Sequence, residues 1–194
     1  MSVSLRRYLI TRTARHAAQV RLREAPARSI PVDLAVLSDF WHVTWHLAVL
    51  HDVPGFSFYD DDGNPQIVLN QAQDPRIQRF TWAHELGHIV FCHPFFPYTA
   101  WRNTQDWVTT LLEIEANAFA AECLIPHDWL MTQLAPYGLP PWNHAVKRAI
   151  FRDNVPQWAQ QLNVSPSVVR YTLIDLAGLP PTVKRAPSRH PTLS

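Results

Sequence analysis

Apolar and polar positions along the 194-residue chain follow two periods, one typical of strands and one typical of helices. Runs of β-branched and aromatic residues predict strands at 43–47, 55–59 and 66–70. The turn residues between the last two predict a hairpin, because Gly63 and Asn64 tolerate a positive φ. We therefore expect a small antiparallel sheet.

Helical patterns lie on both sides of this sheet. Residues 5–24 predict a basic helix with apolar positions at Leu5, Leu9, Ala17 and Val20, and Pro31-Val-Asp33 opens a short helix over 34–40. We expect the first of these to belong to an extension outside the core.

Two longer helices are predicted after the sheet. Asp74-Pro75 is typical of a helix start, and that helix should run to about Cys92. The next should begin near 104–106 and continue to Leu124. The pattern predicts an α+β protein with four parts: a basic N-terminal extension (1–30), a core (31–135), a helical C-terminal segment (136–179) and a flexible tail (180–194).

Composition narrows the class of protein. Hydrophobic residues make up 47% of the chain, which excludes a disordered or fibrous protein. The longest apolar run falls short of the ~18 residues of a membrane span. Residues 1–30 lack the apolar core of a secretory signal, although an organelle transit peptide stays an alternative. Two cysteines are too few for a disulfide framework, so we expect a soluble cytoplasmic protein.

The net charge of +1 conceals an acidic middle. Residues 1–30 carry +6, residues 31–126 carry −9 and residues 127–194 carry +4. This distribution argues against a nucleic-acid groove through the centre of the chain. It favours a cation-binding middle, with a solvated acidic face as the alternative.

The strongest chemical signal is His84-Glu85-Leu86-Gly87-His88. Residues four apart on a helix share a face, so His84 and His88 can direct two imidazoles at one ion. Zinc accepts imidazole nitrogen readily, and Glu85 is close enough to take a proton from a metal-bound water.

The acidic second helix offers a third ligand. Glu113 and Asn117 are four apart, so Glu113 can ligate the metal while Asn117 hydrogen-bonds a ligand. Glu115 is rotated by about 200° from Glu113 and is interpreted as an exposed charge. We place Glu122 on roughly the Glu113 side, two turns away, with a structural role. Gly87 and Ala116 should let the two helices approach closely.

Residues 79–88 and 113–126, which contain these two motifs, resemble the ImmA/IrrE metallopeptidases. The resemblance covers about 31–176 and implies a zincin-like minimal metalloprotease core. It implies a gluzincin-type zinc site with His84, His88 and Glu113 as ligands and Glu85 as the general base. Manganese is the alternative ion.

The same resemblance implies a function. Members cleave a helix-turn-helix repressor, usually encoded nearby, and so derepress phage, mobile-element or stress-response genes. Two hypotheses of other classes stay open: a regulator that sequesters the repressor without cutting it, and a DNA-binding regulator. The oxyanion donor stays open among five candidates, which are His93, Tyr98, Arg102, His127 and Tyr137.

Other signals are weaker. We interpret Cys92 as a buried thiol rather than a ligand, the Asp60–Asp62 run as a solvated turn, and His42, His46 and His51 as ordinary histidines. Residues 155–173 have the spacing of a helix-turn-helix. Its expected core is Ala159, Leu162, Val164, Val169 and Leu173, with Ser165 as a helix cap. Arg170 is the one basic residue in that stretch, so packing or partner docking is favoured over DNA contact.

Overall fold

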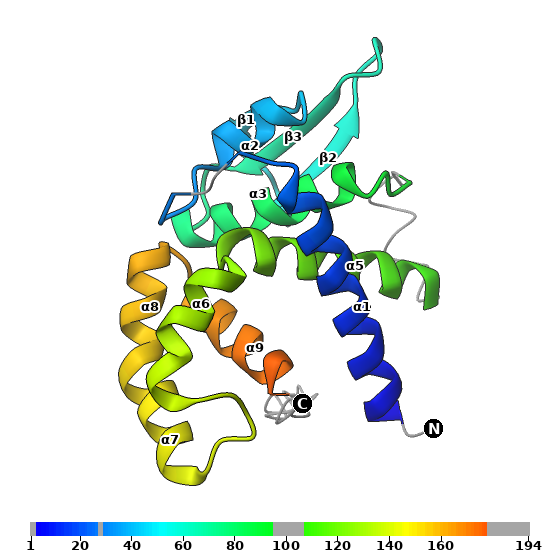
Figure 1. Cartoon of the computed structure of the whole chain (residues 1–194). Helices are drawn as coiled ribbons and strands as arrows, with labels where there is room; N and C mark the ends of the chain where they lie inside the picture. The colour runs from blue at the N-terminus through cyan, green and yellow to red at the C-terminus, as the bar shows by residue number, and fades with distance from the viewer. Residues whose placement is uncertain (1–2, 27–28, 95–106, 178–194) are drawn as a thin grey trace, which may run out of the picture.

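The computed structural model describes residues 3–26, 29–94 and 107–177. Within them the chain is α+β, as predicted (Figure 1). A three-stranded sheet packs on the helix that follows it in the chain, the next long helix packs on the other side of that helix, and a group of shorter helices completes the chain. The elements are α1 (Val3–Arg23), α2 (Leu34–Phe40), β1 (Thr44–Ala48), β2 (Gly55–Tyr59), β3 (Pro65–Asn70), α3 (Pro75–Val90), α5 (Trp107–Leu124), α6 (His127–Leu134), η1 (Ala135–Tyr137), α7 (His144–Arg148), η2 (Ala149–Asn154), α8 (Val155–Leu162) and α9 (Pro166–Leu176).

The sheet is mixed rather than antiparallel, which corrects the prediction. The β2–β3 hairpin is antiparallel as expected, but β1 pairs with β3 in parallel, giving the order β1-β3-β2. The reason is that residues 49–54 cross the end of β3 instead of forming a tight turn. Asn70 holds this crossover, because its side-chain amide donates to the carbonyls of Leu50 and Val53 at 2.9 and 3.0 Å.

Helix α3 lies between the sheet and α5 (Figure 1). It begins at the predicted residue, where Asp74 accepts a hydrogen bond from the backbone N–H of Arg76 at 2.8 Å. Its inner side joins the core through Ala83 and Leu86, which are fully buried with Ile67 of β3. The helix ends at Val90, two residues earlier than predicted, so Cys92 lies beyond it.

Helix α1 packs along α5, and its buried side differs from the one predicted. Ala14, Ala18 and Leu22 are buried, whereas Leu9 and Val20 are exposed. The contact stripe thus consists of two small alanines and Leu22, while two of the predicted apolar positions lie on the solvent side. The segment predicted as an extension therefore covers one face of α5.

The C-terminal helices lie across α5 from the sheet (Figure 1). Helices α8 and α9 pack together in the expected helix-turn-helix arrangement, and all five predicted core residues are buried. Asn163 makes the turn with φ 52°. Ser165 stands at the N-cap of α9 as predicted, although its side chain makes no capping hydrogen bond.

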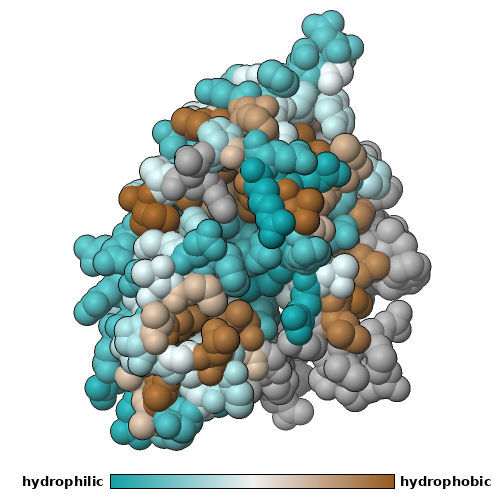
Figure 2. All heavy atoms as spheres, in the orientation of Figure 1, coloured by the Kyte–Doolittle hydropathy of each residue, from teal (hydrophilic) through white to brown (hydrophobic). Residues whose placement is uncertain are grey.

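Two further expectations concern the surface. The tip of the β2–β3 hairpin is hydrophilic (Figure 2), and Asp60 accepts hydrogen bonds from the backbone N–H groups of Asp62 and Asn64, so this acidic run is a solvated turn as predicted. In the described part of the chain, no helix combines the length and the apolar content that crossing a bilayer would require. The predicted tail, 180–194, and the predicted helix start at 104–106 lie outside the described residues.

Candidate metal centre

Helix α3 presents His84 and His88 on the side that faces α5. They are one turn apart, and their Nε2 atoms lie 3.1 Å from each other. The two rings are steeply inclined, with an interplanar angle of 72°. The imidazole nitrogens therefore converge on one point beside the helix.

Glu113 of α5 supplies a carboxylate at the same point. Its Oε1 lies 3.1 Å from His88 Nε2, and its Oε2 lies 3.4 Å from His84 Nε2. The approach of the helices makes this possible: a Cβ on Gly87 would lie 3.0 Å from Phe119 Cβ and 3.2 Å from Ala116 Cα. The close contact predicted for Gly87 and Ala116 is present.

The three side chains suit a tetrahedral cation. Bonds of about 2.0–2.1 Å from zinc to nitrogen or oxygen imply donor separations of about 3.3 Å. The separations here are 3.1–3.4 Å. His84 Nδ1 lies 3.2 Å from Asn117 Oδ1, an acceptor, so the proton of neutral His84 is on Nδ1 and its Nε2 lone pair points at the group. Facing lone pairs and a carboxylate require a cation or a proton between them.

The pKa values of this group reflect that requirement. Burial alone would lower the pKa of His84, but the hydrogen bond to Glu113 and the charges of Glu85 and Glu113 outweigh it and raise the pKa. Burial alone would raise the pKa of Glu113, but hydrogen bonds from His84 and His88 lower it to about 2. Glu113 is thus an anion over the whole physiological range, as a metal ligand must be.

Glu85 is held by the sheet. Its Oε2 accepts a hydrogen bond from Ser57 Oγ of β2 at 2.7 Å. Strand β2 reaches α3 because Gly55 leaves room: a Cβ there would lie 2.7 Å from Thr81 Cγ2. Gly55 and Ser57 share one face of the strand, and Thr81 and Glu85 share one face of the helix. The predicted general base therefore has a partner on a strand.

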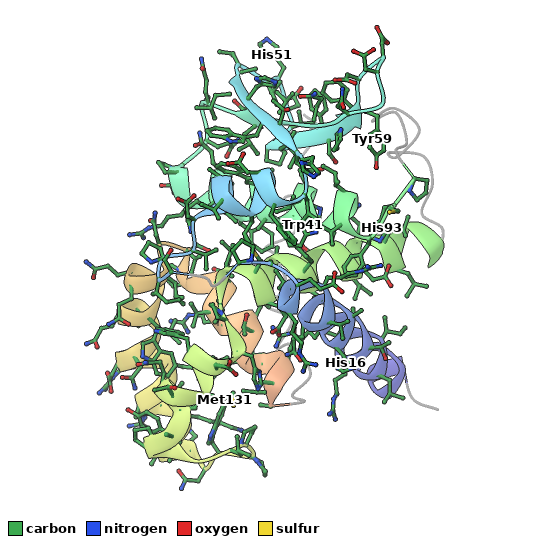
Figure 3. All side chains as sticks on the ribbon, turned by 45° about the horizontal axis from the view of Figure 1, so that its top comes forward. His16, Trp41, His51, Tyr59, His93 and Met131 are labelled. Carbon is green, nitrogen blue, oxygen red and sulfur yellow. The ribbon has the colours of Figure 1, made fainter. Side chains whose placement is uncertain are left out.

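His93, just beyond α3, contacts the second metal-facing histidine. Its Nδ1 lies 2.9 Å from His88 Nδ1, and its Nε2 lies 3.1 Å from Glu115 Oε2 on α5. Figure 3 shows it between the end of α3 and α5. Burial, and then the charge of His88, lower its pKa and outweigh the hydrogen bond to Glu115, so His93 is neutral. With both nitrogens engaged and only 4% of its side chain exposed, it is unsuited to donate to an oxyanion.

The other oxyanion candidates gain no support. Tyr98 and Arg102 lie outside the described residues. Tyr137 accepts a hydrogen bond from Asn154 Nδ2 at 2.7 Å within the C-terminal segment, and His127 is exposed at the start of α6.

Three interpretations of single residues change. Glu115 is part-exposed, at 41%, but it also bonds His93. Glu122 is structural as predicted, yet it faces α1 rather than the Glu113 side, because nine residues at about 100° each make two and a half turns and so end on the opposite face. Cys92 is exposed and has φ 53°, so it is neither buried nor on the face of the metal-facing histidines.

Sequence reasoning missed the placement of Ser57 and His93. Alternation along 55–59 puts Ser57, the one serine of β2, on the face of Gly55, which is a usable signal. The signal for His93 is its position just after the helix end, where the chain turns back.

Comparisons with known proteins agree with this geometry. A family model described as the IrrE N-terminal-like domain, peptidase M78, matches residues 48–173. The protein named uncharacterized immunity region protein 2, from Bacillus phage phi105, is 33% identical over 117 residues, which are 60% of this chain and 71% of the phage protein.

A Mycobacterium tuberculosis transcriptional regulator of known structure has a TM-score of 0.52 at 16% identity, over 84% of this chain and 47% of the regulator. This likeness concerns the fold alone, and the chain spans about half the length of that regulator. The family model, in contrast, matches well over half of the chain and includes both motif-bearing helices. The chain therefore belongs to the IrrE N-terminal-like family of M78 peptidases, the family that its motifs resemble.

Proposed function

We propose that this chain is a zinc-dependent endopeptidase that cleaves a peptide bond in a transcriptional repressor. The observation that supports it most directly is the convergence of His84, His88 and Glu113, with the carboxylate of Glu85 on the same helix. Manganese is the alternative ion, because the set of imidazole and carboxylate donors accepts both.

Each residue of the site has a separate role in the proposed hydrolysis. A zinc ion held here would lower the pKa of a coordinated water toward neutrality. Glu85 takes the proton from the attacking water and delivers it to the leaving amine. Ser57 holds Glu85 Oε2, which leaves the other carboxylate oxygen to accept the proton. Asn117 fixes the orientation of His84 through its Nδ1.

The substrate class is proposed from the family and from the phage relative, whose name places it in an immunity region. Phage immunity is maintained by repressors, so a helix-turn-helix repressor encoded nearby is the proposed substrate. Cleavage would derepress phage, mobile-element or stress-response genes. The reaction would then occur in the cytoplasm, where such a repressor binds DNA.

The test is incubation with the neighbouring repressor under three conditions: with zinc, with a chelator, and with Glu85→Gln in place of the wild type. Cleavage should require zinc and the intact Glu85, and Glu85→Gln should still bind zinc. An uncut repressor with zinc-loaded wild-type protein would refute the peptidase.

A second candidate is sequestration of the repressor without cleavage. It is favoured by the paired helices α8 and α9, whose exposed Tyr171 and Arg170 offer a docking face of modest charge. If Glu85→Gln relieves repression as well as the wild type, sequestration replaces cleavage as the function.

A further inference from the structure

The chain turns sharply at the end of α3, and the turn returns it toward the metal-facing histidines. The N–H of Cys92 donates to the carbonyl of Ile89, and the N–H of His93 donates to the carbonyl of His88, both at 2.9 Å. With Cys92 in the left-handed region at φ 53°, these bonds form a Schellman motif. In this motif the residue after the left-handed one contacts the residue five positions before it, which here pairs His93 with His88.

The side chains use this contact for a hydrogen bond. His88 Nδ1 and His93 Nδ1 are 2.9 Å apart, and their rings are inclined at 74°. Phe91 stacks on His93 with ring centroids 5.7 Å apart and an interplanar angle of 23°. His93 Nε2 then reaches Glu115 Oε2 at 3.1 Å. Two helices and the turn thus hold one imidazole in a fixed orientation.

A single arrangement of protons satisfies these contacts together with a metal. His88 directs Nε2 toward Glu113, so a cation there requires the His88 proton on Nδ1. That proton needs an acceptor, so His93 must present an unprotonated Nδ1. The proton of His93 is then on Nε2, where the Glu115 carboxylate accepts it.

The opposite arrangement disables the site. If His93 donated from Nδ1, His88 would carry its proton on Nε2, where it would block a cation. His93 is also poorly placed to be a ligand itself, because it contacts the nitrogen of His88 that points away from Glu113.

We propose that His93 and Glu115 are positioning residues that hold His88 in its Nδ1–H form, so that its Nε2 faces the metal. The turn that ends α3 is thereby part of the metal centre. This inference rests on the metal site of the proposed function, and it concerns metal affinity rather than peptide cleavage.

The two metal-facing histidines are supported differently. His84 has a neutral amide as its partner, Asn117, on α5 itself. His88 has an imidazole backed by a carboxylate, which makes its partner a stronger acceptor. The loss of Glu115 should therefore be felt at His88 and not at His84.

The test measures zinc affinity of the full chain by competition with a chromogenic chelator, with zinc chloride as the probe. Loss of a partner behind a ligating histidine weakens metal binding by about 10–100-fold. We expect a loss in this range for His93→Phe, and a loss toward its lower end for Glu115→Ala. His93→Asn should restore most of the affinity, because its Oδ1 can accept from His88 and its Nδ2 can donate to Glu115.

Two controls separate this role from folding and from net charge. Glu115 is part-exposed, so Glu115→Ala should keep the far-ultraviolet circular dichroism of the wild type even if His93→Phe does not fold. Asp61→Ala removes the same charge from the exposed hairpin tip and should leave zinc affinity unchanged. Wild-type affinity in a folded Glu115→Ala or His93→Phe would overturn the proposal.

Long-range ¹H–¹⁵N correlation of the zinc-loaded protein gives an independent readout. We expect His88 as the Nδ1–H form and His93 as the Nε2–H form, whereas an Nδ1–H or doubly protonated His93 would overturn the inference. A failure of the proposed function looks different: the wild type would leave the repressor uncut, or bind no zinc at all, and neither result depends on the variants.

Discussion

Helix α5 carries two glutamates nine residues apart, and they have opposite characters. Glu113 faces α3, has 24% of its side chain exposed, and contacts the imidazoles of His84 and His88. Glu122 faces α1 and has 5% exposed. Its carboxylate lies 3.4 Å from Arg15 Nη1 and accepts a hydrogen bond from Gln19 Nε2 at 3.0 Å.

The residues that contact each carboxylate, rather than its burial alone, decide whether it can bind a metal ion or only stabilises the fold. A guanidinium keeps its proton at any physiological pH, so Arg15 places a permanent positive charge beside Glu122, and a metal ion is not needed there. A neutral imidazole has a lone pair that can bind either a proton or a metal ion, so the partners of Glu113 can exchange one for the other. One helix thereby joins a fixed ion pair on one face to a candidate metal site on the other.

The largest expected effect on stability is at the ion pair of Arg15 and Glu122. Glu122→Ala should lower the free energy of unfolding by about 3 kcal/mol, because it leaves a largely buried arginine, with 12% of its side chain exposed, without this counter-charge. Urea denaturation in the presence of a chelator measures it. The double variant Arg15→Met, Glu122→Leu should recover much of the loss, and equal losses in the single and double variants would contradict the interpretation.

At Glu113 the expected effect is on metal binding instead. Glu113→Gln keeps the shape of the side chain but removes the anionic ligand. Zinc affinity should therefore fall by more than it does on loss of a residue that only supports a ligand, which is about 10–100-fold. Wild-type protein at a zinc concentration of 100 times Kd should gain about 2.7 kcal/mol in unfolding free energy, and Glu113→Gln should gain almost none at that concentration. Thermal denaturation with and without zinc measures the difference. A zinc response in Glu113→Gln equal to that of the wild type would exclude Glu113 as a ligand.

Local spacing explains how much of this could be predicted from sequence. His84 and His88 are four residues apart, as are Glu113 and Asn117, so helix geometry alone places each pair on one face, with Glu85 next to the first pair along the chain. Their convergence then follows once the helices pack together. The fold class and the hairpin were likewise readable from period and turn residues.

The features that were mispredicted depend on contacts between distant parts of the chain. The parallel pairing of β1 requires a crossover that Asn70 anchors, and no local sequence pattern predicts this crossover. The buried side of α1 is marked by Ala14 and Ala18, whose small side chains give a weak periodic signal. His93 depends on the left-handed turn at Cys92, a conformation that favours glycine.

The pH dependence of the metal-free protein should also distinguish the two glutamates. The lowered pKa of Glu113 contributes stability above its ordinary value of 4.5, which is lost as the pH falls toward about 2. The raised pKa of His84 contributes stability below its ordinary value of 6.5, which is lost as the pH rises through the raised value. Both contributions are present between these two ordinary values.

In the presence of a chelator, Glu113→Gln should therefore lower the free energy of unfolding most near pH 5.5 and less at pH 8. At both pH values this loss should be smaller than the loss caused by Glu122→Ala. Urea titrations at the two pH values measure this. A cost at pH 8 equal to that at pH 5.5 would show that the contact of His84 with Glu113 does not stabilise the metal-free fold.

The smallest expected effect is at Cys92, on the metal side of α5. A non-glycine residue in the left-handed region costs about 1–2 kcal/mol, so Cys92→Gly should stabilise the chain by about 1 kcal/mol once the greater freedom of glycine in the unfolded state is subtracted. The control is the reverse kind of substitution, Gly63→Ala, at φ 81° with open space around it. It should destabilise the chain by a similar amount through backbone conformation alone. Zinc affinity should be unchanged in both variants, because glycine keeps the turn that brings His93 to His88. If Cys92→Gly weakened zinc binding, the Cys92 side chain rather than the shape of the turn would be holding His93 in place.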